Sequence, residues 1–214
     1  MRGQPWTART PTRAAADALR RFHAFELDAG NDEVDRLLGL DTHAGERSTA
    51  RDEGRDQRHN RLYRGDMPYT VIRALYRRLA PAERAHILDL GSGYGRIALY
   101  GGALLGVRFT GIEIVPARVR EADRASRALG LRRVVFRAGD ALTAPWPRAS
   151  CICLMNSFMP RQTPQALKRL RLEAETGTVV AAVSTVATPL ANQSWLEELP
   201  GADRGRLLRL FRTR

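Results

Sequence analysis

Long apolar segments are absent from this sequence of 214 residues. No run approaches the roughly 18–20 apolar residues that a membrane-spanning helix needs. The N-terminus carries arginines but no apolar core of a signal peptide. We therefore expect a cytoplasmic protein without a membrane partner.

Cysteine is almost absent as well. Cys151 and Cys153 alternate on one expected strand, where two side chains on the same face are too close along the chain to favour a disulfide. No further cysteine and no nearby histidine completes a metal-ligand set, and His43 and His59 lie in a charged stretch without suitable neighbours. We expect two small buried side chains and no metal.

Lysine is represented by Lys168 alone, so the positive charge comes from arginine. Thirty-five basic against 23 acidic residues give a formal net charge of +12. Such a charge fits a nucleic acid or another acidic partner. Arginine together with abundant alanine and glycine is also typical of a GC-rich coding sequence, and the arginines are scattered. Composition therefore leaves both explanations open.

What the chain does contain is a glycine-rich turn that follows a short apolar run suited to a buried strand. Gly91, Gly93 and Gly95 can adopt positive φ and let a ligand approach the backbone. A helix is expected from Arg96, so its free N–H groups would face that ligand. These features predict a nucleotide or nucleoside site at the mouth of a parallel sheet.

The details of this turn reduce the number of ligand classes that fit it. The spacing Gly-x-Gly-x-Gly differs from the dinucleotide fingerprint, and no Gly-Lys-Ser/Thr follows, which excludes a P-loop. Asp89, just before the turn, would repel a pyrophosphate but attract a cationic amino-acid moiety.

Strands and helices alternate along most of the chain. This order predicts an α/β fold with a Rossmann-like, doubly wound, mostly parallel sheet and right-handed crossovers. Strands are expected at residues 86–90, 108–114, 133–137, 150–155, 178–186 and 206–211. Helices are expected at residues 13–27, 32–40 (capped by Asn31), 70–79, from 96, 116–129, 163–173 and 195–199. Gly101 and Gly102 would either end the helix from residue 96 or let it pack closely on the sheet.

Two parts are expected in the chain. Residues 1–61 form a helical and flexible N-terminal extension, in which residues 41–61 are a charged, exposed link. Residues 62–214 form the α/β domain.

Polar side chains end three of the expected strands. Glu113 ends the second strand, which lies beside the first, and its carboxylate can accept hydrogen bonds from ribose hydroxyls. Asp140, followed by Ala141, ends the third strand near the place of an adenine ring. Asn156 and Phe158 follow the fourth strand and would hold a nucleophile and form an apolar wall around it.

These motifs resemble a known class. The segment from Asp89 to Gly95 looks like motif I of the class I S-adenosylmethionine-dependent methyltransferases. Residues 62–186 resemble one branch, the disruptor-of-telomeric-silencing family of non-SET histone lysine methyltransferases. Tyr63-Arg64-Gly65-Asp66 is similar to that family's Tyr-Gly-Glu segment, which covers the cofactor, and Asn156-Ser157-Phe158 to its Asn-Asn-Phe. The inserted arginine, Asp66 for Glu, Ser157 for Asn and Arg96 for Gln depart from the pattern.

The resemblance implies an enzyme that transfers a methyl group from S-adenosylmethionine by in-line displacement to a nucleophile such as a protein lysine amine. Asn156 and Phe158 are the implied catalytic residues. The implied cofactor-binding residues are Tyr63, Asp66, Asp89, Gly91, Ser92, Gly93, Gly95, Glu113, Asp140, Ala141 and Asn156. Two alternatives stay open: an RNA or DNA methyltransferase, and a non-catalytic module that binds S-adenosylmethionine.

Overall fold

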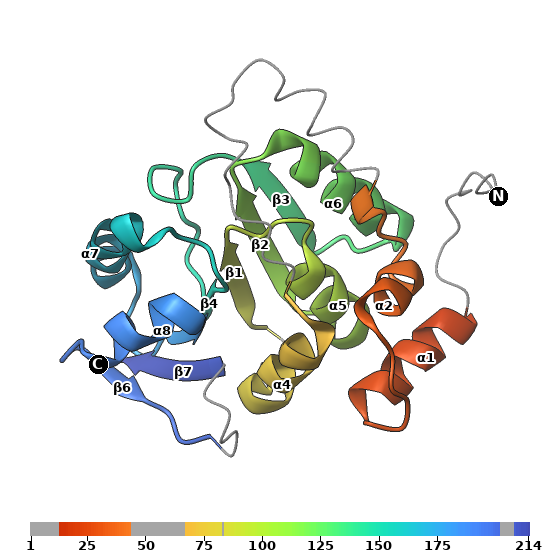
Figure 1. Ribbon diagram of the computed structural model, residues 1–214, viewed down its shortest axis with the longest axis horizontal. Helices are drawn as coiled ribbons and strands as arrows, with labels where there is room; N and C mark the ends of the chain where they lie inside the picture. The colour runs from red at the N-terminus through yellow and green to blue at the C-terminus, as the bar shows by residue number, and fades with distance from the viewer. Residues whose placement is uncertain (1–12, 44–66, 83, 202–207) are drawn as a thin grey trace.

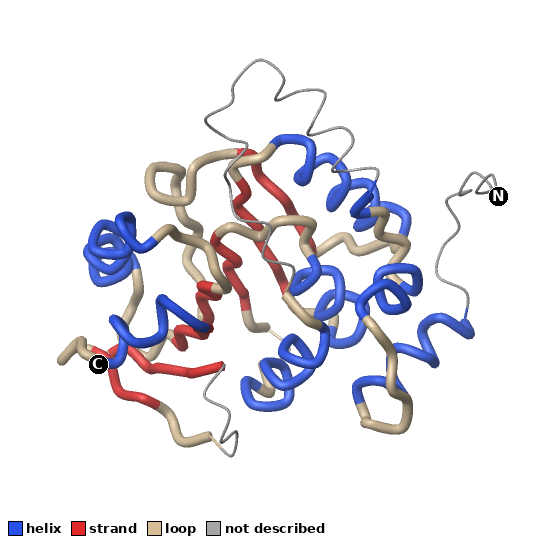
Figure 2. The backbone as a smooth tube through the Cα atoms, viewed as in Figure 1, coloured by secondary structure: helices blue, strands red, loops and turns tan. Residues whose placement is uncertain are grey.

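The chain folds around a seven-stranded sheet with helices on both faces (Figures 1 and 2). A computed structural model describes residues 13–43, 67–82, 84–201 and 208–214. The strands are β1 (His86–Leu90), β2 (Arg108–Glu113), β3 (Val134–Ala138), β4 (Cys151–Leu154), β5 (Val179–Val183), β6 (Leu196–Glu198) and β7 (Leu208–Thr213).

The strand order is β3-β2-β1-β4-β5-β7-β6. Strands β1 to β5 pair in parallel, whereas β7 runs antiparallel to both β5 and β6. The order reverses at β1, from which the chain proceeds first to β2 and β3 and then to β4. In open α/β sheets a ligand binds at such a switch point, beyond the carboxyl ends of the strands. The glycine turn lies at this place, and the expected Rossmann-like α/β fold is confirmed.

Two apolar layers enclose the sheet. The helices are α1 (Arg13–His23), α2 (Asn31–Leu37), α4 (Tyr69–Leu79), α5 (Arg96–Leu105), α6 (Pro116–Ala128), α7 (Thr163–Glu173) and α8 (Ser184–Ala191), with a short 3-10 turn at Pro160–Gln162. Side chains of α1, α2, α4, α5 and α6 share one buried cluster with one face of the sheet. Side chains of α7 and α8 form a second cluster on the other face.

Glycine at residue 101 is required by packing inside α5. A Cβ on Gly101 would lie 2.4 Å from the hydroxyl of Tyr76 and 2.7 Å from the ring of Phe109. The helix therefore continues through both glycines and approaches α4 and β2 closely, as one of the two expectations had it.

Three local expectations were wrong. Residues 196–198 form strand β6, not a helix, because their backbone pairs with β7. Strand β5 ends at Val183, and the unexpected helix α8 follows it. Asn31 is the first residue of α2 and does not cap it, since its Oδ1 accepts a hydrogen bond from the backbone N–H of Tyr69 at 3.0 Å.

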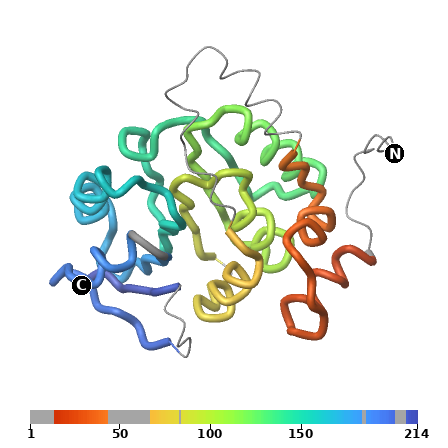
Figure 3. Tube along the Cα trace, in the orientation of Figure 1, coloured from red at the N-terminus to blue at the C-terminus, as the bar shows by residue number. Residues whose placement is uncertain are grey.

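The N-terminal helices lie against the α/β domain (Figure 3). Leu19 and Phe22 of α1, Val34 of α2 and Leu38 directly after α2 are at most 1% exposed and share their cluster with α4 and α5. The expected division between residues 61 and 62 falls outside the described residues. Helices α1 and α2 nevertheless contribute to the main core.

Candidate cofactor site

The glycine turn connects β1 to α5 with three residues in the left-handed region. Gly91, Gly93 and Gly95 have φ of 70°, 55° and 75°. A Cβ on Gly95 would lie 2.4 Å from the ring of Phe136, and one on Gly91 would lie 3.1 Å from Ser157. A Cβ on Gly93 would meet nothing within 4 Å among the described residues. The turn is therefore packed against protein at two positions and open at the third.

Glu113 joins the end of β2 to this open position. Its Oε2 accepts a hydrogen bond from the N–H of Gly93 at 2.8 Å, and its Oε1 accepts one from the N–H of Val115 at 2.9 Å. The guanidinium of Arg118 lies 4.0 Å from Oε1. A carboxylate offers about four acceptor sites, so lone pairs are left for ribose hydroxyls. Glu113 is thus fixed beside the space over Gly93.

Asp89 lies beneath the turn and is 1% exposed. Burial, and to a lesser extent the negative charge of Glu113, raise the pKa of Asp89 to about 8. Its Oδ2 is buried without a hydrogen-bond partner in the part of the chain that the structure describes. The same holds for Oγ of Ser92 and Oγ of Ser157. Three unpaired buried oxygens in and beside one glycine turn fit a polar ligand that completes their hydrogen bonds.

Asp140 follows β3 and is half-buried. Its Oδ1 accepts a hydrogen bond from the N–H of Leu142 at 2.8 Å, which makes it the cap of a turn. The N–H of Gly139, one residue earlier, donates to the backbone oxygen of Glu113 at 2.9 Å. Asp140 and the buried Ala141 are therefore placed next to the end of β2, beside Glu113.

Asn156 follows β4 in a left-handed conformation, with φ of 59°. Asparagine tolerates this region better than most residues, and unusual backbone conformations concentrate at functional sites. Ser157 packs against Gly91, so the end of β4 touches the glycine turn. Phe158 is 7% exposed and belongs to the apolar cluster under α7 and α8. Sequence reasoning did not predict the contact of Ser157, because it saw this serine only as a departure from a family pattern.

Tyr63 and Asp66, expected to cover the cofactor, lie outside the described residues. Metal ligation is likewise not indicated by the described residues, since no three His, Cys, Asp or Glu side chains among them are placed to hold an ion. No described helix is both long and apolar enough to cross a membrane.

A buried polar triad behind the turn was not expected from the sequence. Arg96, the first residue of α5, donates from Nη2 and Nε to the carboxylate of Asp35 on α2 at 2.5 and 3.0 Å. The hydroxyl of Tyr69 on α4 donates to Asp35 at 2.6 Å. Burial first, and then the charge of Asp35, raise the pKa of Tyr69 well above its usual range. The triad ties α2 and α4 to the helix that begins at the glycine turn, and no pattern in the sequence connects residues so far apart.

Comparison with known proteins agrees with this geometry. Residues 87–175 match the family model described as Methyltransferase domain. No curated protein matches the chain.

Solved structures share the fold. An RNA methyltransferase from Salinibacter ruber in complex with S-adenosyl-L-homocysteine is 24% identical, with a TM-score of 0.55 over 69% of this chain and 92% of that chain. TrmN from Thermus thermophilus is 19% identical, with a TM-score of 0.60 over 74% of this chain and 53% of that chain. The C-terminal domain of precorrin-6Y C5,15-methyltransferase from Rhodobacter capsulatus is 17% identical, with a TM-score of 0.54 over 71% and 92%.

The strand order, and the glycine turn at the point where that order reverses, are those of a Rossmann-like methyltransferase fold. The match of residues 87–175 to a methyltransferase domain, and the structure of the same fold solved with S-adenosyl-L-homocysteine, agree with S-adenosylmethionine as the cofactor of this site. The narrower resemblance to the disruptor-of-telomeric-silencing family finds no support in these comparisons.

Proposed function

We propose that the chain binds S-adenosylmethionine over Gly93 and transfers its methyl group to a nucleic-acid acceptor held at the end of β4. The observation that carries the cofactor site is the open space over Gly93, directly beside the fixed carboxylate of Glu113. An acid at the end of β2 next to a glycine turn is the arrangement that accepts ribose hydroxyls in doubly wound folds.

The residues of this chain bind the cofactor and the acceptor and orient them for transfer. Bound S-adenosylmethionine supplies a methyl group on a positively charged sulfur that leaves as a neutral thioether. On this proposal the glycine turn and Asp89 hold the amino-acid part, Glu113 holds the ribose, and Asp140 with Ala141 borders the adenine. Correct placement of donor and acceptor accounts for most of the rate, because the methyl group is already activated.

The acceptor would lie against Asn156, Ser157 and Phe158. The amide of Asn156 offers both a donor and an acceptor, and the next residue, Ser157, packs against Gly91 of the glycine turn. Asn156 is suited to orient a nitrogen nucleophile that enters as the neutral form. A positive sulfur nearby disfavours a protonated amine, so the proton would pass to water before transfer.

Charge favours nucleic acid as the acceptor class. The formal net charge is +12, and two of the solved structures of the same fold are named as an RNA methyltransferase and TrmN. A protein lysine amine is the second candidate, supported by the similarity of Asn156-Ser157-Phe158 to the Asn-Asn-Phe motif.

Cofactor binding is tested by calorimetric titration with S-adenosylhomocysteine. We expect Glu113→Gln, which keeps the size of the side chain, to bind at least about tenfold more weakly than wild type. Glu173→Gln, an exposed acid at the end of α7, is the matched control and should bind like wild type. Equal binding by both variants would remove Glu113 from the site.

Transfer is tested with methyl-labelled cofactor in fractionated cell extract. Label in RNA or DNA supports the proposal, whereas label in protein selects the lysine alternative. Binding without transfer to any fraction indicates a non-catalytic module. Asn156→Gly preserves the left-handed backbone while removing the amide, and should lose turnover but keep S-adenosylhomocysteine binding. Asn192→Gly, at the exposed end of α8, is the control.

A further inference from the structure

A row of arginines lies along the amino-terminal ends of the strands, at the end of the sheet opposite the glycine turn. Arg108 opens β2, Arg133 precedes β3, Arg84 precedes β1, and Arg148 precedes β4. These four strands are parallel neighbours, so their amino ends meet at one edge. These four residues are called the basic edge, and all four are exposed. Arg137 is also exposed, but it lies near the carboxyl end of β3, in register with Ile112.

Among the described residues, no helix covers the sheet beside this edge. Residues 139–150, which connect β3 to β4, are all described and form turns and loop only. Val135 on β3 is consequently 46% exposed. Arg137, two residues further, lies on the same face, because side chains along a strand alternate. The arginines therefore border an accessible sheet surface.

Positive charges from β2 and β3 act on His86 at the start of β1. His86 pairs with Arg108 in register, and its Nε2 lies 2.9 Å from Oγ1 of Thr110. The pKa of His86 is lowered, first by burial and then by the positive charges of Arg108 and Arg137, against a backbone hydrogen bond to Arg148. The side chains of Arg108 and Arg137 and the backbone of Arg148 thus all act on His86.

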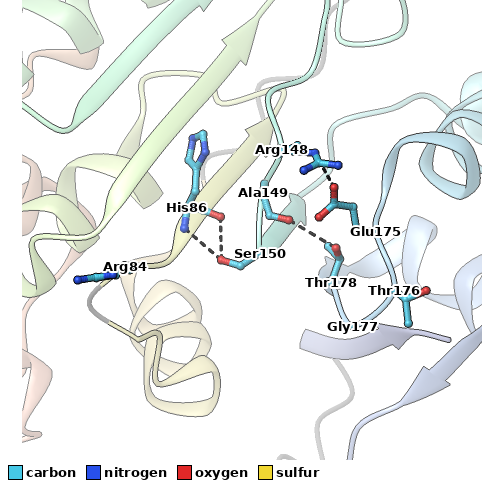
Figure 4. Close-up of a pocket in the computed structure, with 9 residues that line it drawn as sticks. All are labelled: Arg84, His86, Arg148, Ala149, Ser150, Glu175, Thr176, Gly177 and Thr178. Carbon is cyan, nitrogen blue, oxygen red and sulfur yellow. Dashed lines mark hydrogen bonds and ion pairs between the residues drawn. The ribbon is translucent and has the colours of Figure 1, made fainter.

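A cavity of about 370 Å³ lies at the β4 end of the basic edge (Figure 4). Arg84, His86 and Arg148 line it, together with Ser150 and Thr178. Glu175, the one acidic side chain among its lining residues, pairs with Arg148 at 2.6 Å. The cavity and the row therefore keep a surplus of positive charge.

We propose that the basic edge binds the sugar-phosphate backbone of a nucleic acid, at a surface separate from the methyl-transfer site. This inference deepens the proposed function and rests on its nucleic-acid acceptor. Arginine is the side chain best suited to phosphate, because its guanidinium matches two phosphate oxygens. Adjacent strands lie about 4.8 Å apart, so four strands span roughly 15 Å. That length corresponds to about four nucleotides of one strand at ~3.4 Å each.

A regular polyanion fits this row better than an acidic protein. The arginines follow the sheet edge at strand spacing, and a phosphate backbone presents its charges in an equally regular line. The methyl-transfer site lies at the other end of strands of four to six residues. A nucleic acid that reaches both places must therefore pass around the sheet.

The test uses the full chain and a fluorescent single-stranded RNA of mixed sequence, with binding followed by anisotropy between about 50 and 200 mM salt. The edge variant carries Arg84→Gln, Arg108→Gln, Arg133→Gln and Arg148→Gln. The control variant carries Arg20→Gln, Arg127→Gln, Lys168→Gln and Arg171→Gln, which remove the same charge from exposed positions on three helices.

The edge variant should lose at least about tenfold in RNA affinity, and the slope of log affinity against log salt should fall by about 2 to 3. The control variant should stay near wild type. Equal losses in both variants, or no loss in either, would overturn the proposal. Displacement of the RNA by polyglutamate with the same dependence on the basic edge would also overturn it, in favour of an acidic protein.

Calorimetric titration of each variant with S-adenosylhomocysteine checks the fold. If the edge variant fails to bind it, the pair Arg84→Gln and Arg108→Gln replaces the fourfold variant, with Lys168→Gln and Arg171→Gln as its control. Absence of S-adenosylhomocysteine binding in the wild type would refute the cofactor site of the proposed function. Absence of edge-dependent RNA binding refutes only the basic edge.

Discussion

Asp89 combines a proposed ligand-binding position with an environment that is unfavourable for a carboxylate. It is buried beneath the glycine turn, and its pKa of about 8 means that it is mainly protonated at neutral pH in the free protein. A ligand with positive groups stabilises the carboxylate, so binding should release a proton from this side chain. Cofactor affinity and protein stability therefore respond to pH in opposite directions.

The affinity for S-adenosylhomocysteine should rise with pH, by up to about tenfold per unit below pH 8, and level off above it. Calorimetry in two buffers of different ionisation enthalpy measures both the affinity and the released proton. Asp89→Asn should bind more weakly and show a flat profile. A flat profile in the wild type would contradict this role.

The free energy of unfolding should fall as the pH rises. The pKa of Asp89 is raised on folding from an ordinary value of 3.8 to about 8, so the unfolded chain loses this proton first. The contribution of the neutral carboxyl is complete below pH 4 and is lost as the pH rises toward 8. Asp89→Asn, which stays neutral, should raise the melting temperature at pH 7, and the gain over wild type should vanish near pH 4. Thermal unfolding at the two pH values checks the sign.

At Gly93, glycine can be required by the positive φ of the backbone and by the space that a ligand needs, and two variants distinguish these requirements. Gly93 and Gly106 both have positive φ, 55° and 63°, and a Cβ on either would meet nothing within 4 Å in the described structure. Alanine at either position should therefore cost about 1–2 kcal/mol of unfolding free energy through φ alone. Only Gly93→Ala should also weaken S-adenosylhomocysteine binding, by at least about tenfold, because its methyl group enters the space beside Glu113. Comparable affinities of the two variants would place the ligand elsewhere.

Much of this residue pattern could be predicted from the sequence. Asp89, Glu113, Asp140 and Asn156 were selected because each ends or follows a strand, and parallel strands bring such positions to one edge. Their individual roles stay predictions. The contact between Gly91 and Ser157 could not be inferred, because it depends on how closely β4 approaches the turn.

Helices α2, α4 and α5 are held together by the triad of Asp35, Tyr69 and Arg96. Arg96 stands at the positive end of the α5 dipole, where a cation is unfavourable unless an acid compensates it. Asp35 supplies that acid from α2, and both side chains are at most 7% exposed. Helix α2 is therefore part of the support of the glycine turn.

Asp35→Asn should destabilise the protein by about 3–5 kcal/mol, because it leaves the charge of Arg96 buried without its acid. The control is Asp17→Asn, which removes the partner of Arg20 in an exposed pair and should cost at most about 1 kcal/mol. Urea unfolding monitored by circular dichroism measures both. Similar urea midpoints for the two variants would show that the triad stabilises the protein no more than an exposed ion pair does.

Elements with a strong local pattern were predicted well, and the others were not. The bounds of β1 and α7 agree with expectation, since apolar runs and periodicity mark them. Residues 196–198 form a strand only because β7 lies beside them, so tertiary pairing overrides their local helical pattern. Helix α8 was missed because Thr185 and Val186 are β-branched like the valines of β5 and because Pro189 lies inside the helix.

Binding of a ligand to the folded state should stabilise the whole molecule. Both apolar clusters pack on the same sheet, so we expect them to unfold together. S-adenosylhomocysteine at about 100 times its dissociation constant should add about 2.7 kcal/mol to the free energy of unfolding. For a chain of this size the melting temperature should rise by roughly 5–10 °C. Glu113→Gln at the same ligand concentration should shift far less. Differential scanning calorimetry measures the shift, and an unchanged melting temperature in the wild type would count against cofactor binding.

The position of β7 has a consequence for the order in which the sheet is completed during synthesis. β6 precedes β7 in the chain, yet it pairs with β7 and not with β5. While a ribosome is still adding residues 208–213, β6 has no neighbouring strand to join and β5 presents an open edge. The parallel half, from β3 to β5, can assemble earlier because all its strands have already been made. A nascent chain stalled before residue 208 should therefore bind S-adenosylhomocysteine at the switch point while its β5 edge is still open to other strands and to chaperones.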